Sequence, residues 1–180
     1  VVTTDHGRTN DGYGHGGQSE RERTTWVATS QKANRRLSSG KSAIVDIAPS
    51  LCRFLGMDVP RDVRFEQDGI SFYGPDDIQE LDVFPYDSTV VLKWEAFRKN
   101  IPVTVWGTTT NRFKEGGRDE WTKLGQARSE DESFTVDLRA LPGSDFFKFV
   151  VETPNTTLNR WHYAKPRKYA HFKLIDALDE

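Results

Sequence analysis

The sequence has one cysteine, no long apolar run and no large excess of charge of either sign. The single cysteine, Cys52, excludes an internal disulfide framework and a cysteine-rich zinc module. No stretch approaches the roughly 18 consecutive apolar residues that a membrane-spanning helix needs, so we expect no transmembrane segment. The formal net charge of -2 gives no reason to expect nucleic acid as a partner.

What the chain does contain is enough apolar and aromatic material for a folded core. Its 180 residues suit one ordinary domain or two small ones. Hydrophobic residues make up 36% of the chain and aromatic residues 12%, with five Trp and eleven Phe. This composition is lean in apolar side chains, but it is far from that of a disordered chain.

The first part of the chain reads as α/β. Residues 1–4 and 24–29 are short β-branched runs that indicate strands, separated by a glycine-rich polar loop. Residues 42–56 have apolar residues at helical spacing, with Gly56 placed to end the helix and Pro49 compatible with its first turn. Because the chain opens inside a strand-like run, we expect it to be a piece of a longer protein.

Residues 61–84 form an acidic segment with two basic and seven acidic side chains, a net charge of -5. A solvated connector is the main interpretation of this composition. A cation site within the segment is the alternative, although the carboxylates show no regular ligand spacing.

The remainder of the chain has the rhythm of short alternating strands separated by turn signals. A sandwich of immunoglobulin or fibronectin III type is the fold that this spacing favours. Within it, Trp94, Trp106 and Trp161 are expected in the core, whereas Trp121 follows a polar turn and is expected at the surface. The expected strands cover residues 89–97, 101–110, 121–127, 134–138, 146–152 and 159–163, with a short closing helix within 165–180.

The densest group of chemically active side chains lies near the start of the chain. Asp5, His6 and His15 fall within eleven residues of one another and are the ligand types that hold Zn²⁺ and similar ions. The glycines around His15 let the loop fold tightly and bring it back toward Asp5 and His6. Histidines on a surface loop are the alternative interpretation of the same residues.

These motifs also resemble those of a known family. The chain looks like the C-terminal part of the alkaline phosphatase superfamily, which includes phosphodiesterase/nucleotide pyrophosphatase and sulfatase-like enzymes. The resemblance covers roughly residues 1–72, and residues 85–180 resemble an uncharacterised C-terminal β-sandwich appended to such proteins in secreted bacterial systems. The matching segments are Thr3-Thr4-Asp5-His6-Gly7-Arg8, Gly14-His15-Gly16-Gly17-Gln18-Ser19-Glu20-Arg21-Glu22-Arg23-Thr24-Thr25-Trp26, Val45-Asp46-Ile47-Ala48-Pro49-Ser50, Leu55-Gly56 and Asp68-Gly69.

The resemblance implies a fold class and a domain division. Residues 1–84 would be an alkaline-phosphatase-like α/β fragment with its acidic connector, taken from a large and mostly parallel sheet covered by helices. Residues 85–180 would be the all-β immunoglobulin/fibronectin III-like sandwich.

The resemblance also implies a two-metal hydrolase, with zinc as the favoured metal. Asp5 and His6 would bind one ion and His15 the other. Arg8 would contact a substrate anion or have a surface or structural role. The family takes its nucleophile and its remaining ligands from upstream sequence. This chain would therefore hold no catalytic residue of its own and would need the missing upstream portion of the domain. His162 and His171 match no position of the family.

Two functions of different classes follow. The first is a C-terminal fragment of a metal-dependent phosphoric (or sulfuric) ester hydrolase of phosphodiesterase type, inactive alone, with a phosphate-ester small molecule or glycan as substrate. The second is a non-catalytic β-sandwich module that binds a glycan or a protein, with Trp121 as a stacking platform for a sugar. The family resemblance places the protein outside the cytoplasm, as a periplasmic, secreted or lipoprotein-anchored protein.

Overall fold

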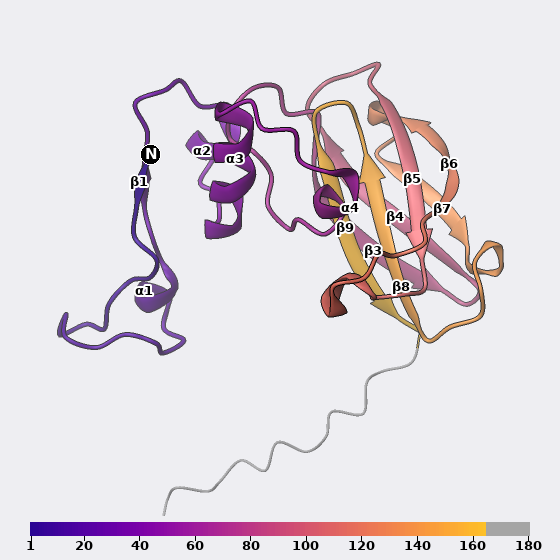
Figure 1. The fold of residues 1–180 in the computed structure, drawn as a ribbon, viewed down its shortest axis with the longest axis horizontal. Helices are drawn as coiled ribbons and strands as arrows, with labels where there is room; N and C mark the ends of the chain where they lie inside the picture. Colours follow the sequence, from indigo (N-terminus) through magenta and orange to yellow (C-terminus); the bar gives the residue numbers. More distant parts are fainter. Residues whose placement is uncertain (165–180) are drawn as a thin grey trace, which may run out of the picture.

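The computed structural model describes residues 1–164, which form a helical N-terminal part followed by two β-sheets (Figure 1). The N-terminal part has a two-stranded ribbon and several short helices. In chain order its elements are β1 (Val2–Thr3), α1 (Glu20–Arg23), β2 (Val27–Ala28), α2 (Arg35–Ser38), η1 (Ile44–Asp46), α3 (Ile47–Phe54) and α4 (Arg61–Arg64).

The seven later strands form two antiparallel sheets, one of three strands in the order β3-β4-β7 and one of four in the order β6-β5-β8-β9. We call residues 78–163 the β unit. Its strands are β3 (Ile78–Tyr86), β4 (Thr89–Ala96), β5 (Pro102–Thr108), β6 (Thr122–Arg128), β7 (Ser133–Asp137), β8 (Phe146–Glu152) and β9 (Thr157–Tyr163), and the short helical turns η2 (Phe113–Glu115), η3 (Ser129–Asp131) and η4 (Leu138–Ala140) lie between them.

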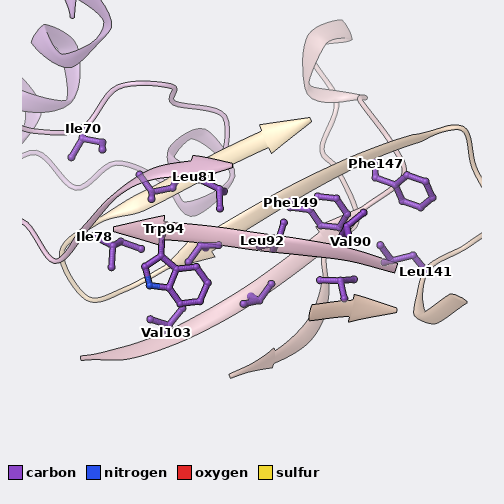
Figure 2. Close-up of a cluster of buried hydrophobic side chains, with 14 residues drawn as sticks. Ile70, Ile78, Leu81, Val90, Leu92, Trp94, Val103, Leu141, Phe147 and Phe149 are labelled. Atoms are coloured by element: carbon purple, nitrogen blue, oxygen red, sulfur yellow. The ribbon is translucent and has the colours of Figure 1, made fainter. Parts of the chain in front are cut away.

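The core lies between the two sheets (Figure 2). In β4 every second residue is buried, because successive side chains of a strand point to opposite faces. Leu92 from the three-stranded sheet and Val105 and Phe149 from the four-stranded sheet are all 0% exposed in one cluster. Trp94 shares this core, and its indole Nε1 donates to the carbonyl oxygen of Ser129 at 2.8 Å, which satisfies its polar end.

Strand β3 occupies a stretch that the sequence had assigned to the acidic connector, so that interpretation is wrong for residues 78–84. The strand forms a hairpin with β4, and its pairing shifts register between Gln79 and Asp82. Glu80, inside this bulge, has a φ of 55°. The expected domain boundary between residues 84 and 85 falls inside β3.

The helices of the N-terminal part are held together by a buried carboxylate. Asp46 is 0% exposed and accepts hydrogen bonds from Nε and Nη2 of Arg36, at 2.9 and 3.1 Å. It also accepts from the backbone N–H of Ala43 and of Ile70, at 2.9 and 2.7 Å. Asp46 therefore joins α2, the start of α3 and residue 70. Gly56, with a φ of 66°, follows the end of α3.

The expected fold class is wrong. The described chain is mostly β, and β1 and β2 pair antiparallel in an isolated ribbon instead of joining a parallel sheet. An alkaline-phosphatase-like α/β layer needs parallel strands with helices packed on both faces, whereas both residues of β1 are exposed. Within residues 1–164, no helix has the length and apolar character required to cross a membrane.

Candidate functional site

The three residues expected to bind metal lie in the N-terminal ribbon and its loop, at the far end of the molecule from the β unit (Figure 1). The rings of His6 and His15 stack, with centroids 4.2 Å apart and planes inclined by 21°. His6 Nε2 lies 3.5 Å from Asp5 Oδ1, and the Asp5 side chain is 87% exposed. The other ring nitrogen, Nδ1 of His6, lies 2.6 Å from the carbonyl oxygen of Gly7.

The two stacked rings do not converge on one ion, because an imidazole nitrogen binds Zn²⁺ in the plane of its ring at about 2.0–2.1 Å and the two planes are nearly parallel. The stacking does not test the expected assignment, in which Asp5 and His6 bind one ion and His15 binds another. Within residues 1–164, no group of three or more His, Cys, Asp or Glu side chains is placed to hold a metal ion. His171 lies outside the described residues. His162 packs against Phe147, and burial lowers the pKa of His162 below its usual range.

A second group of functional side chains lies on the outer face of the four-stranded sheet, the face turned away from the core. Pairing places Phe146 opposite Tyr163 and Lys148 opposite Trp161. Because side chains alternate along a strand, these four share one face, while Phe149 points into the core. The sheet thus aligns three aromatic rings and one lysine along β8 and β9.

We call Phe146, Trp161 and Tyr163 the aromatic platform. The rings of Phe146 and Trp161 meet edge to face, with centroids 5.6 Å apart and planes at 81°. Phe146 and Tyr163 lie 5.1 Å apart at 50°. Trp161 is 47% exposed, on a strand at the edge of its sheet. The platform therefore offers a broad indole surface supported from the side by other rings.

Beside the platform, Lys148 is buried between two carboxylates, an arrangement that we call the Lys148 cluster. Its side chain is 1% exposed. Its Nζ pairs with Oε1 of Glu66, lies 2.7 Å from Oδ2 of Asp119, and lies 3.4 Å from Oδ1 of Asn111. The Nζ also stands 5.9 Å from the Trp161 ring centroid, close enough for a cation–π contact.

The pKa values of the two carboxylates in the cluster shift in opposite directions. Burial raises the pKa of Glu66, and the ammonium of Lys148 offsets this only in part. For Asp119, burial also acts to raise the pKa. Hydrogen bonds from Lys148, from the Thr110 hydroxyl and from the Arg112 backbone N–H outweigh it, so the pKa of Asp119 is lowered. One cation facing two carboxylates gives the cluster no positive excess at neutral pH.

The other end of the outer face is covered by the chain around α4. The Arg61 guanidinium stands 3.9 Å over the Trp106 ring, and the buried ring of Phe65 packs edge-on against Trp121 at 5.1 Å. Asn159 donates from Nδ2 to the carbonyl oxygen of Gln67 at 2.9 Å. Trp121, expected as the exposed platform, is therefore half-buried. Trp161, expected in the core, is the exposed tryptophan of this face.

Comparison with known proteins gives no family. No family model matches the chain, and no curated protein does. Two crystal structures of the pectate lyase Pel3 from Pectobacterium carotovorum are similar to part of it. One is 26% identical over 51% of this chain and 27% of that chain, with a TM-score of 0.34. The other is 25% identical over 53% of this chain and 29% of that chain, with a TM-score of 0.36.

The chain thus spans less than a third of the length of these lyases, and TM-scores this low carry no functional argument. The resemblance to the alkaline phosphatase superfamily is contradicted, since β1 and β2 form an isolated antiparallel ribbon in a mostly β chain, no family model matches, and residues 1–164 contain no group of side chains placed to hold a metal ion. The hydrolase, phosphodiesterase and metal-binding interpretations that rested on it fall with it.

Proposed function

We propose that this chain is a non-catalytic binding module that holds a glycan against the aromatic platform. The observation that carries the proposal is the exposed indole of Trp161, which stands on a sheet edge between the buried Lys148 and the ring of Phe146. An indole with one exposed face and fixed neighbours provides a large apolar surface at little cost in side-chain entropy.

The chemistry of the platform suits a sugar ring. The C–H faces of a pyranose are apolar and pack on an aromatic face, while its hydroxyl groups stay in the solvent or bind polar neighbours. Bases of single-stranded nucleic acid also stack on such rings, but that mode needs a positively charged groove along the backbone. Here the nearest cation, Lys148, is already paired with Glu66 and Asp119.

A pull-down with insoluble cellulose, chitin, xylan and mannan tests the proposal, followed by titration with soluble oligosaccharides of the polymer that binds. We expect Trp161→Ala to weaken binding at least about tenfold, or about 1.4 kcal/mol. Trp26→Ala is the matched control, because Trp26 is 54% exposed but lies in the N-terminal ribbon.

Two results would contradict the proposal. The first is the absence of binding to every polymer of the panel. The second is retention of full affinity by a folded Trp161→Ala variant. Capture of a protein partner through the same face, with no affinity for any polysaccharide, would instead identify a protein-binding module.

A further inference from the structure

A cleft of about 270 Å³ lies between α3 and the turn that joins β8 to β9. It is independent of the aromatic platform. The lining is mixed, and Pro49, Met57 and Ile70 form its apolar wall. The volume is near the lower end of the roughly 300–1,000 Å³ typical of small-molecule sites. Its principal polar residues are Arg53, Arg64, Gln67, Ser71, Asn155 and Thr156.

Arg53 is fixed in the wall of this cleft by neutral oxygens. Its Nη1 donates to the carbonyl oxygen of Asn155 at 3.0 Å and to that of Pro75 at 3.4 Å. Its Nη2 donates to Oδ1 of Asn155 at 2.9 Å. A guanidinium has five N–H groups, so these three contacts leave Nε–H and one Nη2–H for another partner.

The amide of Asn155 is itself held in one orientation. The carboxylate of Asp77, which is 0% exposed, accepts from Asn155 Nδ2 at 3.0 Å and from the Asn155 backbone N–H at 3.1 Å. With its nitrogen bound to Asp77, the amide must present Oδ1 to Arg53. The guanidinium is thereby positioned before any ligand arrives, and this lowers the entropy cost of binding.

The charge of Arg53 is not neutralised by the part of the chain that the structure describes. Within residues 1–164, no carboxylate lies within ion-pair distance of Arg53. Arg64, the second arginine of the cleft, pairs with Glu152 at 3.4 Å. Glu152 also pairs with Arg61 at 3.8 Å and accepts from Trp106 Nε1 at 3.0 Å. Two guanidinium groups line the cleft, that of Arg53 without a carboxylate partner in the described residues, and Asp58 is the one carboxylate among the lining residues.

We propose that this cleft binds a small hydroxylated carboxylate of the sugar-acid class. The carboxylate pairs with the guanidinium groups of Arg53 and Arg64, because a planar fork of N–H donors matches a carboxylate in geometry as well as charge. The hydroxyl groups bind the amides and hydroxyls that line the rest of the cleft. The apolar wall then packs against the C–H face of the ligand.

Cys52 gives a direct measure of occupancy, because it is the single cysteine of the chain, is half-buried and lines the same cleft. Its rate of alkylation by iodoacetamide is measured in the presence of glucuronate, glucose, acetate or inorganic phosphate. We expect glucuronate to slow alkylation at least fivefold at saturation. Glucose lacks the carboxylate and acetate lacks the hydroxyl groups, so neither protects at the same concentration.

Arg53→Gln is expected to raise the glucuronate concentration needed for protection at least tenfold, and Arg64→Gln severalfold. Arg64→Gln is less prone to disturb the fold than Arg53→Gln, because the Arg53 side chain also hydrogen-bonds Asn155. Arg61→Gln is the control, since Arg61 is on α4 but does not line the cleft. The proposal is overturned if glucuronate fails to protect, if glucose protects equally, or if Arg64→Gln and folded Arg53→Gln protein are protected as well as wild type. Equal protection by phosphate would identify a general anion site and overturn the sugar-acid assignment.

Discussion

Asp77 and Asn155 lie 78 positions apart in the chain, and the carboxylate of one holds both the side-chain amide and the backbone N–H of the other. The same carboxylate accepts from Arg98 Nη1 at 2.9 Å and from the Thr153 hydroxyl at 3.0 Å. One buried side chain, just before β3, therefore joins the two sheets at the β8–β9 turn.

Replacing Asp77 with Asn is expected to destabilise the protein by about 1–3 kcal/mol, because an amide cannot accept every hydrogen bond that the carboxylate receives and leaves buried donors unsatisfied. Urea denaturation followed by tryptophan fluorescence measures the change. Asp137→Asn is the comparison, since Asp137 pairs with Arg139 at the surface. If the two variants unfold at the same urea concentration, the buried network contributes nothing.

Replacing Lys148 with Met is expected to cost about 3–5 kcal/mol, since it leaves two buried carboxylates facing each other without a cation. Adding Glu66→Gln and Asp119→Asn to the same chain removes the uncompensated charges and should recover much of that loss. Chemical denaturation of the single and triple variants measures both steps. A triple variant no more stable than Lys148→Met would show that packing, not charge, dominates the cluster.

The stability of the fold is expected to depend on pH through Asp76. Burial raises the pKa of this carboxyl from 3.8 to about 6, against a weaker opposing effect of Arg36 and Arg35, and neither carboxylate oxygen has a hydrogen-bond partner in the described chain. Because the pKa is higher in the folded state, the folded protein binds the proton more tightly. The contribution of Asp76 to stability is therefore fully present below pH 3.8 and is lost as the pH rises through 6.

Asp76→Asn, which mimics the protonated acid, is expected to be more stable than wild type at pH 8 by up to about 3 kcal/mol. The difference should shrink below pH 6 and vanish near pH 4, as measured by thermal unfolding across that range. Asp137→Asn should show almost no trend across that range, because hydrogen bonds from Arg139 lower the pKa of Asp137 to about 2 and it stays ionised above pH 4. A constant difference between Asp76→Asn and wild type at all pH values would contradict this prediction.

Gly69 packs directly against the backbone of η1, so that a methyl group there would overlap the carbonyl of Val45. Gly69→Ala is expected to force the two segments apart and to cost about 1–3 kcal/mol. Gly143→Ala is the matched control, because nothing lies within 4 Å of a Cβ at that position. Thermal unfolding followed by circular dichroism separates them, and equal melting temperatures would show that the backbone around residue 45 yields freely.

The sequence predicted the later strands well and missed β3. Alternation places residues 89–97 and 146–152 in strands, and the structure has strands at Thr89–Ala96 and Phe146–Glu152. β3 was not predicted because its acidic residues resemble those of a solvated loop and because the bulge at Glu80 breaks the two-residue alternation. A strand with a bulge is hard to recognise from two-residue alternation, because the bulge interrupts that alternation.

The site was harder to predict for a different physical reason. Alternation gives the face of a strand on which a side chain lies, but not whether another part of the chain covers that face. Trp106 and Trp161 share the outer face, yet Arg61 and Phe65 cover only the first. Closeness in sequence is also a weak guide to ligand geometry: His6 and His15 lie near each other, but their rings stack with nearly parallel planes and do not converge on one ion.

The irregular form of β3 also hinders pairing of this strand with a strand of a second molecule. β3 is an outer strand of the three-stranded sheet, and such strands can pair with a second molecule and begin ordered aggregation. A second chain approaching β3 would meet the bulge at Glu80, the exposed charge of Asp82, and Pro85, which has no N–H to donate. The bulge that hid this strand from its sequence pattern thus opposes edge-to-edge pairing between two β units.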